Sequence, residues 1–285
     1  MSRLSLLCAA LCLLGVSSAQ EIRAPQNVIA GDDASISTTG SGKATFYLFG
    51  PGVSRKSDVD LGQQVQLNGN DLRNAGEYFA MVCSGECHSA NFFVVPAKPS
   101  SITFLVHPSR VPVAEGDAIS GVAIPFDKYR NLVIAPESVN FQLGTGKASV
   151  LSRSVATKDG IAWFRTASGK SAGALQVEAS LKDLSTRRAV QQVASDPCNL
   201  RITGQRNAKG IVVQTEPVHD CAGNPVPDGT IVTFTATADG QKSTVDAPIK
   251  QDVARAEISA SGPAVVSAAS GVVMGNELRI GGGAR

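Results

Sequence analysis

Short runs of β-branched and aromatic residues alternate with turn residues along most of the chain. Clear examples are residues 44–49, 101–106, 175–179 and 230–237, with Gly, Pro, Asn, Asp or Ser nearby. Such runs indicate β-strands, because branched and aromatic side chains suit the pleated backbone. Apolar residues are not sustained at the helical spacing i, i+3, i+4 and i+7. The pattern therefore predicts an all-β fold with few helices.

Part of this pattern is repeated. Residues 127–141 match residues 220–234 at a constant offset of 93 without a gap. Residues 172–179 match residues 261–268 at an offset of 89, and residues 75–82 are a weaker third copy. A unit of about 90 residues has the size of a small β-sandwich, whereas solenoid repeats are much shorter. The identical residues of the first match are Asp127, Asn131, Val133, Val139 and Phe141.

The repeat divides the chain into domains. We expect tandem immunoglobulin-like β-sandwich domains at residues 20–97, 98–195 and 196–285, the first of them assigned by its length and one hairpin. The junctions near residues 97 and 196 are short and contain proline. Because such spacers are stiff, the sequence predicts a semi-rigid rod.

The first 19 residues have the composition of a secretory signal peptide. Arg3 precedes an apolar run at residues 4–16, which small residues follow at the cleavage position. The run is too short to span a membrane, and no later stretch reaches ~20 apolar residues. We therefore expect a secreted or periplasmic protein without an integral membrane segment. The 26 Lys and Arg residues nearly balance the 24 Asp and Glu residues, so the charge gives no sign of nucleic acid binding.

Four cysteines follow this segment: Cys83, Cys87, Cys198 and Cys221. An even count in an exported chain indicates disulfides before metal binding or catalysis. Three pairings are possible, and adjacency favours Cys83 with Cys87 and Cys198 with Cys221. The first pair would close a hairpin. The second would stabilise its domain by about 3 kcal/mol through the loop of intervening residues.

In one motif of the third domain, Asp220 is followed, after three residues, by Asn224-Pro-Val-Pro-Asp-Gly and then by a strand with Val-Thr-Phe. This motif resembles the bacterial immunoglobulin-like modules of the invasin and intimin type. Residues 157–179 are similar to the second half of that module, where a turn with Asp-Gly precedes a strand with Gly, Val and Ala. The resemblance covers about residues 100–285. It implies β-sandwiches that serve as spacers or belong to surface adhesins, with function set by local sites.

The leading hypothesis is accordingly an exported structural or binding protein whose partner is a protein or a glycan. Loops at domain ends and open sheet edges are the usual contact surfaces of such modules. The predicted binding loops contain Ser84, Gly85, Glu86, Asp127, Asn131, Asp220 and Asn224.

No catalytic, cofactor-binding or metal-binding residue is predicted. The three histidines are scattered one per domain and have no metal-ligand spacing. Several acidic turns contain oxygen ligands that suit Ca²⁺, but they lack a six-ligand spacing, so we expect turn formers and solvated loop ends. These acidic residues are Asp58, Asp60, Asp127, Asp159, Asp220 and Asp228.

Two alternatives remain open. An enzyme would need carboxylates such as Glu115, Asp117 and Glu137 to converge as an acid and base pair.

A carbohydrate-binding or accessory module of an extracellular enzyme system would instead show aromatic side chains aligned on one face. The residues available for this are Trp163, Tyr47, Tyr78 and Tyr129. Aromatics make up only 5% of the chain, which argues against an extended sugar platform. Trp163 and Phe164 are adjacent in a strand, so one of them must face outward, and we expect Trp163 to be the buried one.

Overall fold

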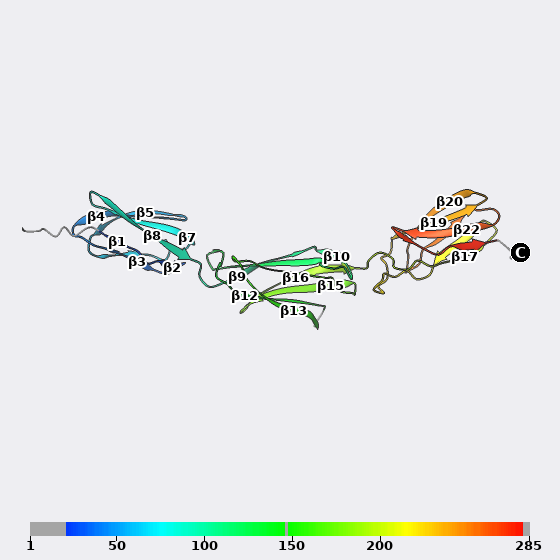
Figure 1. Ribbon diagram of the computed structural model, residues 1–285, viewed down its shortest axis with the longest axis horizontal. Coiled ribbons are helices and arrows are strands. Elements are labelled where there is room, and N and C mark those ends of the chain that lie inside the picture. Colours follow the sequence, from blue (N-terminus) through cyan, green and yellow to red (C-terminus); the bar gives the residue numbers. More distant parts are fainter. Residues whose placement is uncertain (1–20, 146–147, 282–285) are drawn as a thin grey trace, which may run out of the picture. The chain divides into compact units, whose positions relative to one another are not determined.

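The computed structural model describes residues 21–145 and 148–281 (Figure 1). Within these residues all regular elements are β-strands, which confirms the predicted all-β fold. No helix in this part of the chain could span a membrane. The predicted signal peptide lies outside the described residues. The strands form six sheets, which pack in pairs around three separate hydrophobic cores.

The first sandwich has a three-stranded sheet in the order β1-β3-β6 and a five-stranded sheet in the order β2-β8-β7-β4-β5. Its strands are β1 (Ile22–Arg23), β2 (Asn27–Ile29), β3 (Ala34–Thr38), β4 (Lys43–Gly50), β5 (Val53–Asp60), β6 (Gln64–Leu67), β7 (Gly76–Cys83) and β8 (Cys87–Val95). Tyr78 is fully buried in this core, where its ring stacks on Phe92 at 5.4 Å between centroids. Its hydroxyl donates a hydrogen bond of 2.9 Å to the carbonyl of Asn74.

The second sandwich repeats this plan. Its sheets have the orders β14-β11-β9 and β10-β16-β15-β12-β13. The strands are β9 (Ser101–His107), β10 (Arg110–Pro112), β11 (Ile119–Phe126), β12 (Ser138–Thr145), β13 (Ala148–Ala156), β14 (Ala162–Thr166), β15 (Gly173–Leu181) and β16 (Leu184–Val193). Phe141 lies at the centre of the core, 4.7 Å from Phe164 and 5.9 Å from Phe104 between ring centroids.

The third sandwich pairs the sheet β17-β18-β21 with the sheet β20-β19-β22-β23, in which β24 also pairs with β22. The strands are β17 (Ile202–Arg206), β18 (Ile211–Thr215), β19 (Ile231–Ala238), β20 (Gln241–Pro248), β21 (Arg255–Ile258), β22 (Ala264–Ser270), β23 (Val273–Met274) and β24 (Leu278–Ile280). Phe234 on β19 is fully buried, as is Phe141, its counterpart at the offset of 93.

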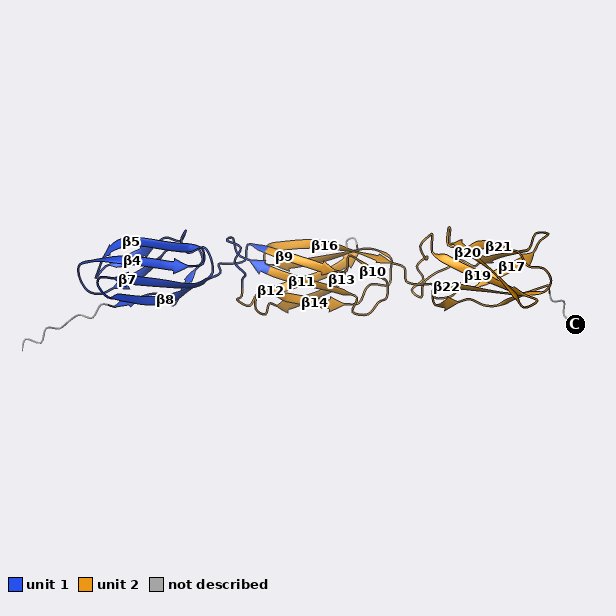
Figure 2. Ribbon diagram, turned by 90° about the horizontal axis from the view of Figure 1, so that it is seen from above, with its two compact units in different colours: residues 1–101, 125–133 blue, residues 102–124, 134–285 orange. Residues whose placement is uncertain are grey.

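The chain divides into two compact units (Figure 2). The first unit contains the first sandwich up to residue 101 together with Pro125–Val133. The second contains the remaining described residues and therefore holds the second and third cores. Segment 125–133 contains the end of β11 and the first part of the loop toward β12 of the second sandwich, but it belongs to the first unit by its contacts.

The expected burial of Trp163 is wrong. Trp163 is 63% exposed, whereas Phe164 is 2% exposed. Successive residues of a strand point to opposite faces, and the inward position of β14 is adjacent to the ring of Phe141. Phe164 takes that position, so Trp163 faces outward from the three-stranded sheet.

Candidate functional site

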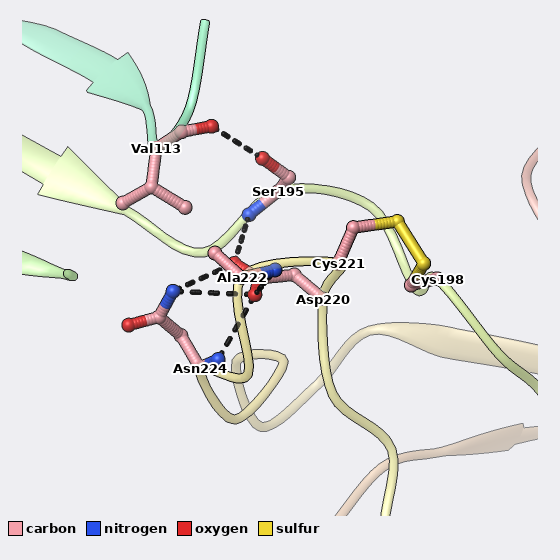
Figure 3. The surroundings of a disulfide bond; sticks show 7 residues. All are labelled: Val113, Ser195, Cys198, Asp220, Cys221, Ala222 and Asn224. Carbon is pink, nitrogen blue, oxygen red and sulfur yellow. Dashed lines mark hydrogen bonds between the residues drawn. A yellow bond between two sulfur atoms is a disulfide. The ribbon is translucent and has the colours of Figure 1, made fainter. Parts of the chain in front are cut away.

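The Asp220 loop between β18 and β19 is built around a buried carboxylate (Figure 3). Asp220 is 4% exposed. Its Oδ1 accepts the backbone N–H groups of Ala222 at 2.8 Å and Asn224 at 2.9 Å, and its Oδ2 accepts that of Ser195 at 3.0 Å. The side-chain amide of Asn224 donates to both oxygens. The expectation of solvated loop ends is therefore wrong for Asp220, although it does form the turn.

The hydrogen bonds to Asp220 decide its protonation. Burial by itself would raise the pKa of this carboxyl group, because the charged form loses hydration. The N–H groups of Asn224, Ser195 and Ala222 and the amide of Asn224 outweigh burial and hold the pKa below its ordinary value. Asp220 is therefore an ionised acceptor at neutral pH, with its oxygens occupied by N–H donors.

Asn224 joins the third sandwich to the second. Its Nδ2 donates to the carbonyl of Lys170 at 2.8 Å, and its Oδ1 accepts the N–H of Ala172 at 3.0 Å. One side-chain amide thus pairs with two backbone groups just before β15, as a neighbouring strand would. Ser195 adds a second connection, since its hydroxyl donates to the carbonyl of Val113 at 2.8 Å. Both contacts lie inside the second compact unit.

The disulfide between Cys198 and Cys221 fixes the loop to the segment that enters the third sandwich (Figure 3). Cys221 directly follows Asp220, and the N–H of Cys198 donates to the carbonyl of His219 at 3.0 Å. The pairing is the one that adjacency favoured. The disulfide restricts the Asp220 loop where it approaches the second sandwich.

The Asp127 loop repeats this arrangement within the first unit. Asp127 is 1% exposed, so the expectation of a solvated loop end is also wrong here. Its Oδ2 accepts the N–H of Ala97 at 3.0 Å. Asn131 donates through Nδ2 to the carbonyl of Arg73 at 2.7 Å and accepts the N–H of Ala75 at 2.9 Å, just before β7. The repeated Asn residues therefore dock on a second repeated motif, the Ala-Gly pair at the start of β7 and β15, while the repeated Asp residues accept N–H groups from the segment between the sandwiches.

A tyrosine extends the contact in the first unit. The ring of Tyr129 lies over Gly31, which has a φ of +86°. A Cβ atom at Gly31 would come within 2.0 Å of the Tyr129 hydroxyl oxygen, so only glycine permits this approach. Lys128 places its ammonium group 4.8 Å from the centre of the same ring.

The hairpin between β7 and β8 carries the other predicted loop. Cys83 and Cys87 form the predicted disulfide across directly paired positions. Ser84, Gly85 and Glu86 lie exposed at the tip. The disulfide fixes the shape of this tip.

The carboxylates considered for an enzyme do not converge. Glu115 and Asp117 precede β11, whereas Glu137 follows the loop after it. The eight residues of β11 correspond to roughly 26 Å. Glu137 instead pairs with Lys182 at 3.0 Å. Among the described residues, no three His, Cys, Asp or Glu side chains are grouped as metal ligands would be.

The four aromatic residues considered for a sugar platform are also separated. Tyr78 is buried, Tyr47 lies on β4 of one sheet, and Trp163 lies on β14 of another. Tyr129 lies against Gly31. They do not form a single aligned row.

Comparison with known proteins identifies the class of fold. No protein-family model matches the chain, and no curated protein is similar to it in sequence. Among solved structures, the Escherichia coli adhesin FdeC is similar with a TM-score of 0.64 and 18% identity, over 92% of this chain and 96% of that chain. Invasin, a bacterial integrin-binding protein, is similar with a TM-score of 0.53 and 11% identity, over 92% of this chain and 59% of that chain.

Yersinia pseudotuberculosis InvD gives a TM-score of 0.50 and 12% identity, over 91% of this chain and 95% of that chain. These similarities show that the protein is a tandem array of immunoglobulin-like β-sandwiches. Its fold is that of the modules in bacterial adhesins of the invasin type, as the Asp220 motif implied.

Proposed function

We propose that this chain is an exported, non-enzymatic binding protein of the adhesin class, in which linked sandwiches present binding surfaces to a protein partner. The supporting observation is the buried Asp220 and Asn224 network, which connects the third sandwich to backbone groups of the second. A loop whose polar atoms bind the backbone of a neighbouring sandwich is suited to linking sandwiches and not to catalysis. The two disulfides fit an extracellular or periplasmic location.

Export is tested by expressing the full chain in a bacterial host with a C-terminal tag. Fractionation and mass spectrometry of the tagged protein should find it outside the cytoplasm, with Gln20 as its first residue. Thiol titration of the denatured, unreduced protein should detect no free cysteine. Cytoplasmic protein with residues 1–19 intact would contradict this part of the proposal.

Adhesion is tested with fluorescent beads that carry the purified mature protein. We expect them to bind cultured epithelial cells or bacterial cells more than beads coated with an unrelated β-sandwich protein do. Protease treatment of the target cells should remove the binding if the partner is a protein. Equal binding by both bead types would contradict an adhesive function.

A glycan-binding function is a second candidate, because Trp163 is exposed and could stack on a sugar ring. Pull-down on insoluble polysaccharides compares the native chain with Trp163→Ala. Retention that depends on Trp163 would favour this candidate over a protein partner.

A further inference from the structure

The outer face of the five-stranded sheet in the first sandwich carries exposed aromatic residues. Phe49, Phe79 and Phe93 lie on the neighbouring strands β4, β7 and β8 and are 40%, 47% and 46% exposed. Phe49 is directly opposite Phe79. Tyr47 stacks on Phe49 at 6.1 Å with ring planes 7° apart, and it is directly opposite Met81. We refer to these five residues as the aromatic patch.

The fold does not require aromatic residues at these positions. The inward side chains of the same strands, such as Phe46 and Tyr78, already form the core. On the corresponding outer face of the second sandwich, Gln142 is opposite Glu178 on the central strands β12 and β15.

In the third sandwich, Thr235 is opposite Ser267 on the central strands β19 and β22. At these paired positions of the two central strands, the second and third sandwiches carry polar residues, whereas the first carries aromatic ones. Contiguous exposed apolar patches of this kind mark interaction surfaces.

Opposite charges lie at two corners of the aromatic patch. Glu77 is on β7, where Asn91 holds its carboxylate with a hydrogen bond of 2.9 Å. Lys56 is on β5 opposite Tyr47, with its ammonium group 5.9 Å from the ring centre. The two charged residues are two strands and four residues apart, a separation of about 16 Å, with Phe49 midway between them.

This arrangement is self-complementary. Consider a two-fold axis that lies in the plane of the face, passes through Phe49 and is perpendicular to the line from Glu77 to Lys56. It would place Glu77 of each copy over Lys56 of the other. The strands of the two sheets would then cross at roughly 70°, near the orthogonal class of sheet packing. A two-fold contact uses the same surface on both copies, so each such interface would contain two of these charge pairs.

We propose that the aromatic patch is an interface through which two copies of this chain pair face to face. The aromatic side chains supply the apolar contact, and Glu77 and Lys56 set the orientation.

The experiment measures the molar mass of the full mature chain by sedimentation equilibrium over a concentration series. We expect a reversible dimer, and Phe79→Gln should raise its dissociation constant at least about tenfold. Leu105→Gln is the matched control, because Leu105 is 60% exposed on the second sandwich and should leave the constant unchanged. Circular dichroism checks that both variants keep the native strand content, as substitutions at exposed positions should allow.

Charge exchange tests the orientation. Glu77→Lys and Lys56→Glu should each weaken the dimer, and the double variant should recover it, because both charge pairs are then restored with reversed sign. A chain that stays monomeric at about 100 µM would overturn the proposal. So would a Phe79→Gln variant that dimerises as well as Leu105→Gln, or a double variant without recovery. If the native chain is monomeric and Phe79→Gln lowers its binding to cells, the aromatic patch contacts a different partner and the proposed dimer is wrong.

Discussion

Removal of the Asn224 side chain should loosen the connection between the second and third sandwiches. Asn224→Ala deletes the bonds to Lys170, Ala172 and the Asp220 carboxylate, while the backbone donors to that carboxylate remain. Each hydrogen bond contributes about 1 kcal/mol net. The positions of Lys170 and Ala172 are exposed, and water can replace part of the loss. We therefore expect a local cost of about 1–2 kcal/mol.

Amide hydrogen exchange followed by NMR measures this cost at one bond. The N–H of Ala172 is bound by Asn224, so in Asn224→Ala its exchange should be roughly 5–30 times faster. Exchange of the buried β19 amides should change little, because that sheet is intact. The measurement is made on the full mature chain.

Asn207→Ala provides the control. Asn207 holds a turn of the third sandwich through bonds to the N–H groups of Lys209 and Gly210, and its side-chain amide also donates to Glu257 of the same sandwich. This variant should lower the stability of the third sandwich but leave Ala172 exchange unchanged. If Ala172 is equally protected in Asn224→Ala and the native chain, the amide does not join the two sandwiches.

Three further predictions concern stability. The pKa of Asp220 is lower in the folded chain than in the unfolded one, so its carboxylate stabilises fully above about pH 4 and progressively less as pH falls through the folded value. Chemical denaturation between neutral and acid pH should show this loss, and Asp220→Asn should remove that component of the pH dependence. Replacing Cys198 and Cys221 by serine should destabilise the third sandwich by about 3 kcal/mol, and the same change at the hairpin disulfide should cost less because its loop is much shorter. Trp163→Gln should alter unfolding free energy by only about 0.5 kcal/mol, whereas Phe164→Ala should cost about 3–5 kcal/mol; similar losses would contradict the assignment of their faces.

The repeat at an offset of 93 predicts most residues of the candidate site but not the segments that they bind. Asp127 and Asn131 recur as Asp220 and Asn224. The Ala-Gly motif was also visible as a repeat. That Asn224 binds the Ala-Gly motif could not be predicted, because Asn224 lies 52 residues from its partner Ala172. The burial of Asp127 and Asp220 could not be predicted for the same reason, since their N–H donors come partly from distant segments.

The faces of the strands also needed the tertiary structure. Alternation identifies an inward face only when polar residues mark the outward one. In residues 46–49 all four side chains are large and apolar or aromatic, so the pattern gives a strand but not the direction of each residue. Trp163 and Phe164 pose the same problem on β14. The partner strands fix these choices by register, since a shift by one residue would turn every side chain to the opposite face.

Residue patterns along the chain are enough to predict the all-β class, the repeated unit of about 90 residues and the neighbouring cysteines that pair. These features depend on local backbone preference and on spacing along the chain, which a sequence states directly. The loops that dock on a neighbouring sandwich and the aromatic residues that face solvent can be identified only from the folded chain. Those features depend on contacts between segments far apart in the chain, where packing and register select one of several locally equivalent arrangements.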